Sequence, residues 1–403
     1  MDTLRIAAAA LAAHKLRSFL TLLGVIIGVM TVISVVSIIA GLNDYIAEKV
    51  FTLSPDVYVV TQFGIITSQK QFLEAVKRKK IDWNDYEAIR EHCTHCAMVG
   101  AQETSQLTVK RAAQKLAGVR VQGGTANIGE ISNVDVEEGR FFTRTEDEHA
   151  AMVTVIGSDV KDELFGKLDP IGRTIRIGSQ PARVIGLLRK QGSVLGRSQD
   201  NQLFMPLTSY RKSFGTRGSI DLYVRAEGGV MGLERSLDQV RVLMRSRRRT
   251  SFRADDPFGV VSAEALQTLW KSISAGGFAL MIFISGISLV VGGIVITNIM
   301  LVSVVERTRE IGIRRALGAR KRTIQFQFLT EAILLSLGGG IAGVVLGILI
   351  SFGISSAFPL PTLVTPSLVI SGLMVAVVTG VAAGYFPARR AANLAPIDAL
   401  RAD

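Results

Sequence analysis

The chain has 403 residues, of which 48% are hydrophobic and 6% aromatic, with 39 glycines and a formal net charge of +12. Its mean hydropathy of +0.35 is higher than a soluble protein usually has, so the composition excludes an ordinary soluble globular protein and predicts a membrane protein. In a soluble chain the positive charge would suggest nucleic-acid binding. In a membrane protein it first indicates which loops face the cytoplasm.

The N-terminal segment "TLRIAAAALAAHKLR" is rich in alanine with Arg and Lys at intervals. We expect residues 1–18 to form a cytoplasmic amphipathic helix along the inner membrane surface. An uncharged stretch follows that is long enough for a transmembrane helix at 19–42. Its apolar core is longer than that of a signal peptide, and no clear small-x-small cleavage site precedes "NDYIAEK". We therefore expect an uncleaved anchor.

Residues 43–275 are charged and mixed in character, which predicts a separate extracytoplasmic domain joined to the membrane by helical stalks. The segment "DWNDYEAIREHC" predicts a helix capped by Asp82. Runs such as "AMVTVIG" and "SIDLYVRA" are rich in β-branched and aromatic residues and predict strands, and a turn is expected at 178–181. The irregular alternation of strands and helices favours an α+β fold in two lobes that divide near 100–140.

One cluster in this domain, "EHCTHC", brings together His92, Cys93, His95 and Cys96. These residues are soft metal ligands at close spacing. Outside the cytoplasm the two cysteines could instead form a local disulfide, or stay as unpaired surface thiols. The pattern leaves all three interpretations open, and we predict no metal site.

Two basic segments also occur in this domain, at 77–80 and 241–253. A solvated surface is the simplest interpretation of each. The alternatives are attraction to an acidic substrate, to anionic headgroups or to a partner protein. Neither segment contains the interleaved aromatic residues that stack on bases, so nucleic acid is not expected as a partner.

Three further transmembrane helices are predicted at 277–305, 326–356 and 367–387. The last two come from one uncharged stretch that is too long for a single helix, and we divide it where Pro359, Pro361 and Pro366 interrupt helical geometry. Basic residues precede the first span, fill the 306–322 loop and follow the fourth span in the tail at 388–403. Because positive residues mark the cytoplasmic side, both termini are expected in the cytoplasm.

The 306–322 loop holds seven basic residues in sixteen positions: Arg307, Arg309, Arg314, Arg315, Arg320, Lys321 and Arg322. These residues could simply fix topology and contact anionic lipid. Their spacing also fits a short amphipathic helix, with apolar contacts from Ile311, Ile313 and Leu317 and a stop at Gly318. Glu306 and Glu310 alternate with the arginines. A helix of this kind can dock in a groove on a partner.

Glycines follow a four-residue period in three of the four predicted spans, which places them on one face of each helix. Close helix contacts are therefore expected, although glycine is also simply common in membrane helices. The glycines concerned are Gly24, Gly28, Gly339, Gly343, Gly347, Gly380 and Gly384.

Enzymatic activity is not expected from this sequence, and we predict no catalytic residue and no cofactor. It has no G-x-x-x-x-G-K-[ST] phosphate loop, and its four histidines lie in no nucleophile or metalloprotease signature. The spans contain scattered Ser, Thr and Asn, and Glu331 is their sole acid, so they provide no charged relay for ions. If the protein depends on ATP, we expect ATP hydrolysis on a partner chain.

Four segments together resemble one family. They are "LRSFLTLLGVIIGVMTVISVVSI", "TVIGSDVKDELFGKLDPIGRTIRIGSQPARVIGLL", "VVERTREIGIRRALGARKRTIQFQFLTEAILLSLGGGIAGVVLG" and "YFPARRAANLAPIDALR". In order and over the whole chain, they look like the permease subunits of MacB-type ABC exporters, which are related to the FtsX and LolC/LolE permeases.

The resemblance implies a bacterial inner-membrane permease with four helices, a large domain between the first two, and a second protomer that is identical or related. A separate cytoplasmic ABC ATPase, which would bind ATP and Mg²⁺, would drive it. Closure of that ATPase would be transmitted through the helices to the outer domain, a mode called mechanotransmission, and substrate would not be pumped through a membrane cavity. The coupling helix would dock on that ATPase through residues that match the family segment, namely Glu306, Arg307, Arg309, Glu310, Ile311, Gly312, Arg314, Arg315, Leu317, Gly318 and Ala319. A periplasmic adaptor and membrane lipid are further expected partners.

Three functions fit this family. The first is export or expulsion of a substrate, and the "DPIGRTIRIG" hairpin and the first span favour this MacB branch. The second is an FtsX-like transducer that activates an extracytoplasmic partner such as a cell-wall hydrolase. The third is LolCE-like release of lipoproteins from the membrane.

Overall fold

The structure is a computed structural model that describes residues 15–46, 53–194, 196–215, 218–357 and 361–395. The chain divides into two compact units, one made of Met1–Ile46 with Lys271–Asp403 and the other of Ala47–Trp270. The amphipathic helix expected over 1–18 lies outside the described residues except for its last four positions, which begin a longer helix. The end of the expected tail, 396–403, also lies outside them.

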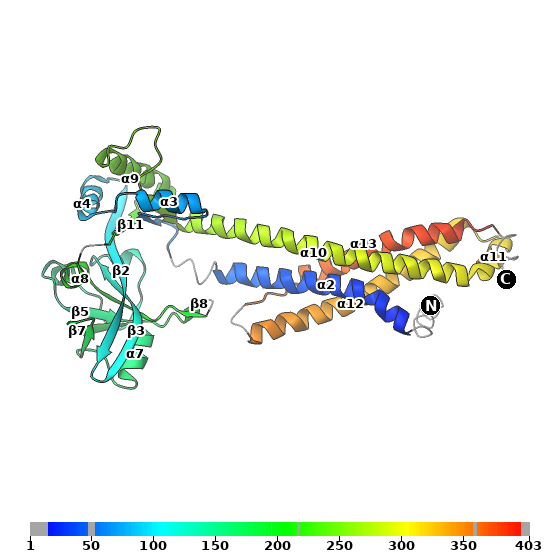
Figure 1. Ribbon diagram of the computed structural model, residues 1–403, viewed down its shortest axis with the longest axis horizontal. Coiled ribbons are helices and arrows are strands. Elements are labelled where there is room, and N and C mark those ends of the chain that lie inside the picture. Colours follow the sequence, from blue (N-terminus) through cyan, green and yellow to red (C-terminus); the bar gives the residue numbers. More distant parts are fainter. Residues whose placement is uncertain (1–14, 47–52, 195, 216–217, 358–360, 396–403) are drawn as a thin grey trace. The chain divides into compact units, whose positions relative to one another are not determined.

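The helices of the first unit are α2 (Lys15–Tyr45), α10 (Ala263–Glu306), α11 (Thr308–Ala316), α12 (Lys321–Ala357) and α13 (Pro366–Ala392) (Figure 1). All except α11 are long and apolar enough to cross a membrane. This confirms the predicted fold class of four membrane helices with a large domain inserted after the first.

The ends of these helices follow from local chemistry. α13 starts where the side chain of Thr365 accepts a hydrogen bond from the backbone N–H of Leu368, with Pro366 in the first turn. Proline is suited to that position because its missing N–H would have no intrahelical partner there. By contrast α10 runs for 44 residues without an interruption, so the predicted stalk and the second span are one helix.

The second unit is built on one ten-stranded sheet in the order β12-β1-β11-β2-β3-β10-β5-β7-β4, with β6 paired to β2 and β7. The strands are β1 (Val57–Thr61), β2 (Cys96–Arg111), β3 (Gln114–Gly124), β4 (Val136–Gly139), β5 (Val153–Ile156), β6 (Thr174–Ile177), β7 (Gln180–Leu188), β10 (Gln202–Pro206), β11 (Asp221–Ala226) and β12 (Gly259–Ser262). A separate two-stranded sheet consists of β8 (Ser193–Val194) and β9 (Arg197–Ser198). β2 and β3 form a long antiparallel pair through 102–124, so no boundary between the two predicted lobes falls within those residues.

Four helices pack on one face of this sheet and form its main core. The main hydrophobic core combines strand residues with side chains from α4 (Trp83–His92), α7 (Ser158–Phe165), α8 (Leu207–Phe214) and α9 (Leu233–Arg247). α4 has the predicted cap at Asp82, which forms a capping box with Asp85. The shorter elements are α3 (Gln69–Lys77), α5 (Ile128–Ile131), α6 (Arg144–Glu148) and the 3₁₀ turn η2 (Gly229–Gly232).

Strand residues alternate between the two faces of the sheet, as the pleat requires. On β11, Leu222 and Val224 lie in the main core, while Asp221 and Tyr223 face the other way. On β3, Val121 lies in the core and Gln122 on the opposite face. The face turned away from the main core is therefore polar at the centre of the sheet.

The cysteine cluster and the second basic segment both have structural roles. Cys93 and Cys96 form a disulfide, which selects one of the three interpretations that the sequence left open. In the basic segment, Arg247 and Arg248 both contact the carboxylate of Asp85, which is 2% exposed. Much of this charge is thus neutralised within the domain instead of forming a solvated surface.

Candidate functional site

The candidate site is α11 with its flanking residues, between the ends of α10 and α12. α10 ends at Glu306, and Arg307 leaves helical geometry before α11 begins at Thr308. After Leu317 the backbone of Gly318 has φ +93°, a left-handed conformation that glycine adopts without steric cost. Glycine therefore provides the turn into α12 that the sequence indicated.

Polar contacts hold α11 against α12. Nη1 of Arg307 lies 3.3 Å from both carboxylate oxygens of Glu331, and these side chains are 24% and 14% exposed. Arg314 donates a hydrogen bond of 2.8 Å to Oε1 of Gln327, and it also pairs with Glu310 one turn earlier. The contacts fix the position of α11 on the first turns of α12.

An apolar contact adds to this attachment. Ile311 is 3% exposed and belongs to the buried cluster that includes Ile324 and Phe328 of α12. By contrast, Ile313 is 46% exposed and Leu317 is 83% exposed. The three residues predicted to offer apolar contacts to a partner therefore separate into one core residue and two surface residues.

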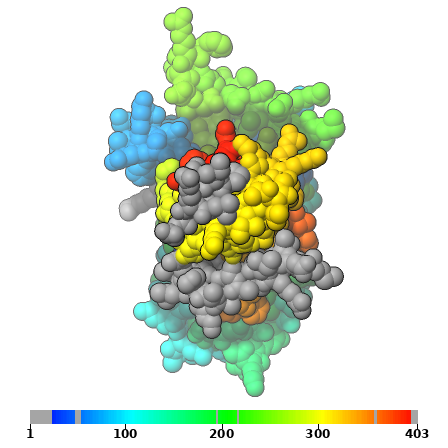
Figure 2. Space-filling model, turned by 90° about the vertical axis from the view of Figure 1, so that its right-hand side faces the viewer, coloured from blue at the N-terminus to red at the C-terminus, as the bar shows by residue number. Residues whose placement is uncertain are grey.

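The remaining predicted coupling residues lie on or next to α11. Glu306, Arg309 and Gly318 are exposed, Arg315 is half-buried and Gly312 is buried within α11. Ala319 packs against the same core as Ile311. Figure 2 shows this end of the unit, with α11 and the adjoining helix ends in yellow beside the end of α13 in red. Nζ of Lys321, at the start of α12, donates a hydrogen bond of 3.1 Å to Oδ1 of Asn393, at the end of α13.

The predicted packing glycines lie where helices meet. A Cβ added at Gly24 would be 2.5 Å from Cα of Gly292, so the backbones of α2 and α10 touch. A Cβ added at Gly28 would meet Leu289, and one added at Gly343 or Gly347 would meet the backbone and side chains of α2. One added at Gly380 would meet Ser336, and one added at Gly384 would meet Ala332. Gly339 is buried in α12. Small residues allow such close approach in membrane helices.

Sequence reasoning missed the partners on the opposing helices. Gly292 contacts Gly24, and Gly340 would meet Ala376 if it carried a Cβ. Glu331 stood out as the sole acid in the predicted spans, but nothing in the sequence linked it to Arg307. The sequence did indicate that a single acid lies near a helix end close to a cluster of arginines, and this pattern could have suggested the ion pair between Glu331 and Arg307.

Taken together, four apolar helices and an inserted α/β domain define a multi-pass membrane protein. Two family models match this chain, the MacB-like periplasmic core domain over residues 18–233 and the FtsX-like permease C-terminal region over 282–396. The chain belongs to this family of MacB-like permeases.

Curated relatives cover the chain from end to end. It is 34% identical over 397 residues to the macrolide export ATP-binding/permease protein MacB of Bdellovibrio bacteriovorus, which is 97% of this chain and 60% of that protein. It is 30% identical to the ABC transporter permease YknZ of Bacillus subtilis, with 100% of this chain and 99% of YknZ aligned. The chain thus spans about 60% of the length of the MacB relatives and nearly all of YknZ.

Among solved structures, the periplasmic region of MacB from Actinobacillus actinomycetemcomitans aligns with 56% of this chain and 96% of that chain. Its TM-score is 0.46 at 14% sequence identity.

Proposed function

We propose that this chain is the permease of a MacB-type ABC transporter. ATP hydrolysis by a cytoplasmic ATPase would move α11, and the membrane helices would pass that movement to the outer domain, which expels a substrate. The observation that carries the proposal is that α11 is held to α12 by Arg307 and Ile311 while it presents Leu317 outward. The exposed side of this segment also carries Arg309 and Glu310, so it offers a partner both apolar and charged groups.

We further propose that the ATPase is a separate polypeptide. The MacB relatives are named as combined ATP-binding and permease proteins, whereas YknZ is named as a permease and aligns over nearly its whole length. The 403 residues contain no phosphate-loop motif. The assembly we propose contains two permease protomers, identical or related, in contact with two ATPases.

The location that fits this function is the bacterial inner membrane with both termini in the cytoplasm. The basic residues from Arg307 to Arg322 support this orientation because positive loops stay on the cytoplasmic side. The macrolide-export relatives favour a small-molecule substrate. FtsX-like signalling and LolCE-like lipoprotein release are not favoured over export by these relatives.

The test is affinity purification of the tagged chain in mild detergent, with measurement of any ATPase that is recovered. We expect a cytoplasmic ABC ATPase to copurify with the intact chain and to be recovered in much smaller amount when Leu317 is replaced by Ser. The variant Arg322→Gln removes a neighbouring exposed charge and is the matched control. Failure to recover an ATPase with a well-inserted, intact chain would contradict the proposed function.

A further inference from the structure

A cavity of about 480 Å³ lies on the face of the large sheet that is turned away from the main core. This volume is within the range of pockets that bind small molecules. The cavity is formed entirely by the second unit, so its shape does not depend on the membrane helices. Nothing in the proposed coupling mechanism uses it.

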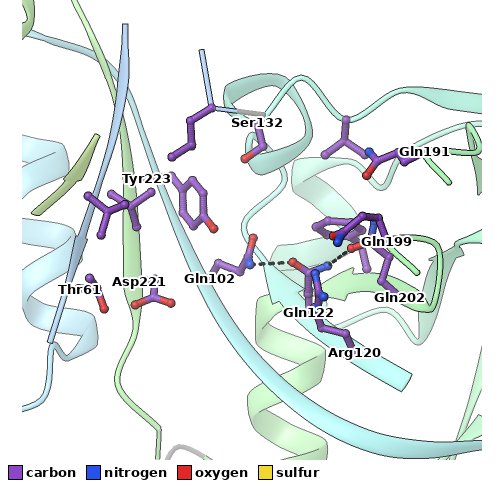
Figure 3. A pocket seen from close by; sticks show the side chains of 15 residues that line it. Thr61, Gln102, Arg120, Gln122, Ser132, Gln191, Gln199, Gln202, Asp221 and Tyr223 are labelled. Atoms are coloured by element: carbon purple, nitrogen blue, oxygen red, sulfur yellow. Dashed lines mark hydrogen bonds between the residues drawn. The ribbon is translucent and has the colours of Figure 1, made fainter. Parts of the chain in front are cut away.

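The floor of the cavity is a row of three glutamines on neighbouring strands. Gln102 donates from Nε2 to Oε1 of Gln122 at 2.9 Å, and Gln122 donates from Nε2 to Oε1 of Gln202 at 2.8 Å (Figure 3). These residues lie on β2, β3 and β10 and are 5%, 7% and 8% exposed. The hydrogen bonds give all three amides the same direction along the row.

Burying three glutamine amides on one face of a sheet costs more free energy than burying apolar side chains there. Buried amides need hydrogen bonds to offset lost hydration, and apolar side chains would fill the same space without that requirement. Each glutamine also has more hydrogen-bonding capacity than the row uses. Within the described residues Nε2 of Gln202 donates no hydrogen bond, so one end of the row offers a donor to the cavity.

The opposite end of the row is also polar. Figure 3 shows Asp221 and Tyr223 on one side of Gln102, with Gln202 and Arg120 on the other. Burial raises the pKa of Asp221, and burial together with the Asp221 charge raises the pKa of Tyr223 to about 12. The Tyr223 hydroxyl is therefore protonated at physiological pH.

The cavity has one ionisable side chain of each sign. Among the described lining residues, Arg120 and Asp221 are the two with charged side chains, and each would oppose a ligand of its own sign. The other polar groups are amides and hydroxyls, including Gln191, Gln199 and Thr61. Apolar wall is supplied by Val59, Phe204 and Val261, and it suits the C–H faces of a ring or a short aliphatic segment.

We propose that this cavity binds an uncharged small molecule that carries both hydroxyl and amide groups and has about the size of a disaccharide. An acceptor of the ligand meets Nε2 of Gln202, a donor meets the Asp221 and Tyr223 end, and the apolar part packs on the wall. Two sources have this chemistry, namely N-acetylated sugars and short neutral peptides.

Binding is measured on the full-length chain by saturation-transfer NMR titration in a detergent without a sugar headgroup, because maltosides would compete for the site. The two probes are N,N′-diacetylchitobiose and a neutral N-acetylated dipeptide amide. We expect saturable binding of at least one, and the probe that binds identifies the source. No ATPase is present, so the outcome is independent of the proposed transport function.

Two variants test the residues. Gln122→Leu breaks the row and is expected to weaken binding by roughly tenfold, the loss typical of a buried hydrogen bond without its partner. Tyr223→Phe removes only a hydroxyl and is expected to weaken binding several-fold even if the first variant folds poorly. The control Gln114→Leu makes the same exchange at an exposed position on the same strand and should leave binding unchanged.

Two results would overturn the proposal. One is the absence of saturable binding for both probes, and the other is equal binding by wild type and both cavity variants. If neither probe binds and Gln122→Leu changes the oligomeric mass in light scattering, the polar face is a contact between copies of this chain.

Discussion

Arg307 and Glu331 lie 24 positions apart in the sequence, yet Nη1 of Arg307 is 3.3 Å from each carboxylate oxygen of Glu331. Arg307 is the residue on which the chain leaves α10, and Glu331 is on α12. One ion pair therefore links the C-terminal end of α10 to the side of α12. The movement of α11 that we propose would therefore reach both helices through this ion pair.

Replacing Arg307 by Gln should uncouple α11 from α12. The carboxylate of Glu331 would lose its partner in a half-buried site, and a loss of about 1.4 kcal/mol in docking free energy would weaken ATPase binding roughly tenfold. The measurement is ATPase recovery and stimulated ATP hydrolysis in reconstituted membranes. The exchange of both charges, Arg307→Glu with Glu331→Arg, should restore part of the ATPase binding. Normal docking in Arg307→Gln would argue against the link.

Leu317 and Ile311 should respond differently to replacement by Ser. At the exposed Leu317, we expect ATPase docking to weaken by about tenfold or more, because a buried leucine contributes about 1.5–3 kcal/mol at an interface, while the unfolding temperature stays unchanged. At the buried Ile311, we expect the unfolding temperature to fall. Thermal unfolding in detergent and ATPase pull-down together separate the two. Similar profiles for both variants would contradict the assignment of faces.

Gly24 should not tolerate even a methyl group. A Cβ there would lie 2.5 Å from Cα of Gly292, so Gly24→Ala must push α2 away from α10 at an expected loss of about 1–3 kcal/mol. Gly353→Ala is the matched control, because a Cβ at that position meets nothing within 4 Å. The unfolding temperature of each purified variant is the readout. Equal stability of the two would show that the helices have room to adjust.

The ion pair between Arg211 and Glu103 predicts a pH-dependent stability. Burial raises the pKa of Glu103, and the guanidinium of Arg211, with Nε 3.2 Å from the carboxylate, lowers it in part. In Arg211→Met the pKa of folded Glu103 rises further. A carboxyl group with a higher pKa in the folded than in the unfolded protein loses stability as the pH rises above its unfolded value, about 4.3.

We therefore expect Arg211→Met to lose about 3 kcal/mol at pH 8 and less at pH 5, as measured by chemical denaturation. The double variant with Glu103→Gln should recover most of the loss and show no such pH dependence. If Arg211→Met loses the same free energy of unfolding at both pH values, the cause is lost packing against Trp83, over which Arg211 lies.

The features that sequence predicted correctly are those encoded locally. Length and hydropathy decide whether a segment can cross a membrane, and the cap at Asp82 depends on residues within one turn. The glycine period indicated which face of a helix permits close approach, but not which helix approaches it. Gly292 could be paired with Gly24 only once the helices were placed.

Features that depend on residues far apart in the sequence could not be predicted from it. Ile311 and Ile313 look equivalent as apolar residues, and only the packing of α11 on α12 shows that the first is buried and the second exposed. The row of glutamines draws on strands that are neighbours in the sheet, yet 77 residues separate the end of β3 at Gly124 from the start of β10 at Gln202. No local pattern marks such a juxtaposition.

The alternation of residues along the strands also has an evolutionary consequence. On β3 and β11 the core residues and the cavity residues occupy interleaved positions, such as Val121 beside Gln122 and Leu222 beside Tyr223. Point substitutions can therefore alter what the cavity recognises while the core stays intact. A one-residue insertion or deletion would exchange the two faces and destroy both. Related permeases are thus free to diversify this surface by substitution, with length changes confined to the loops.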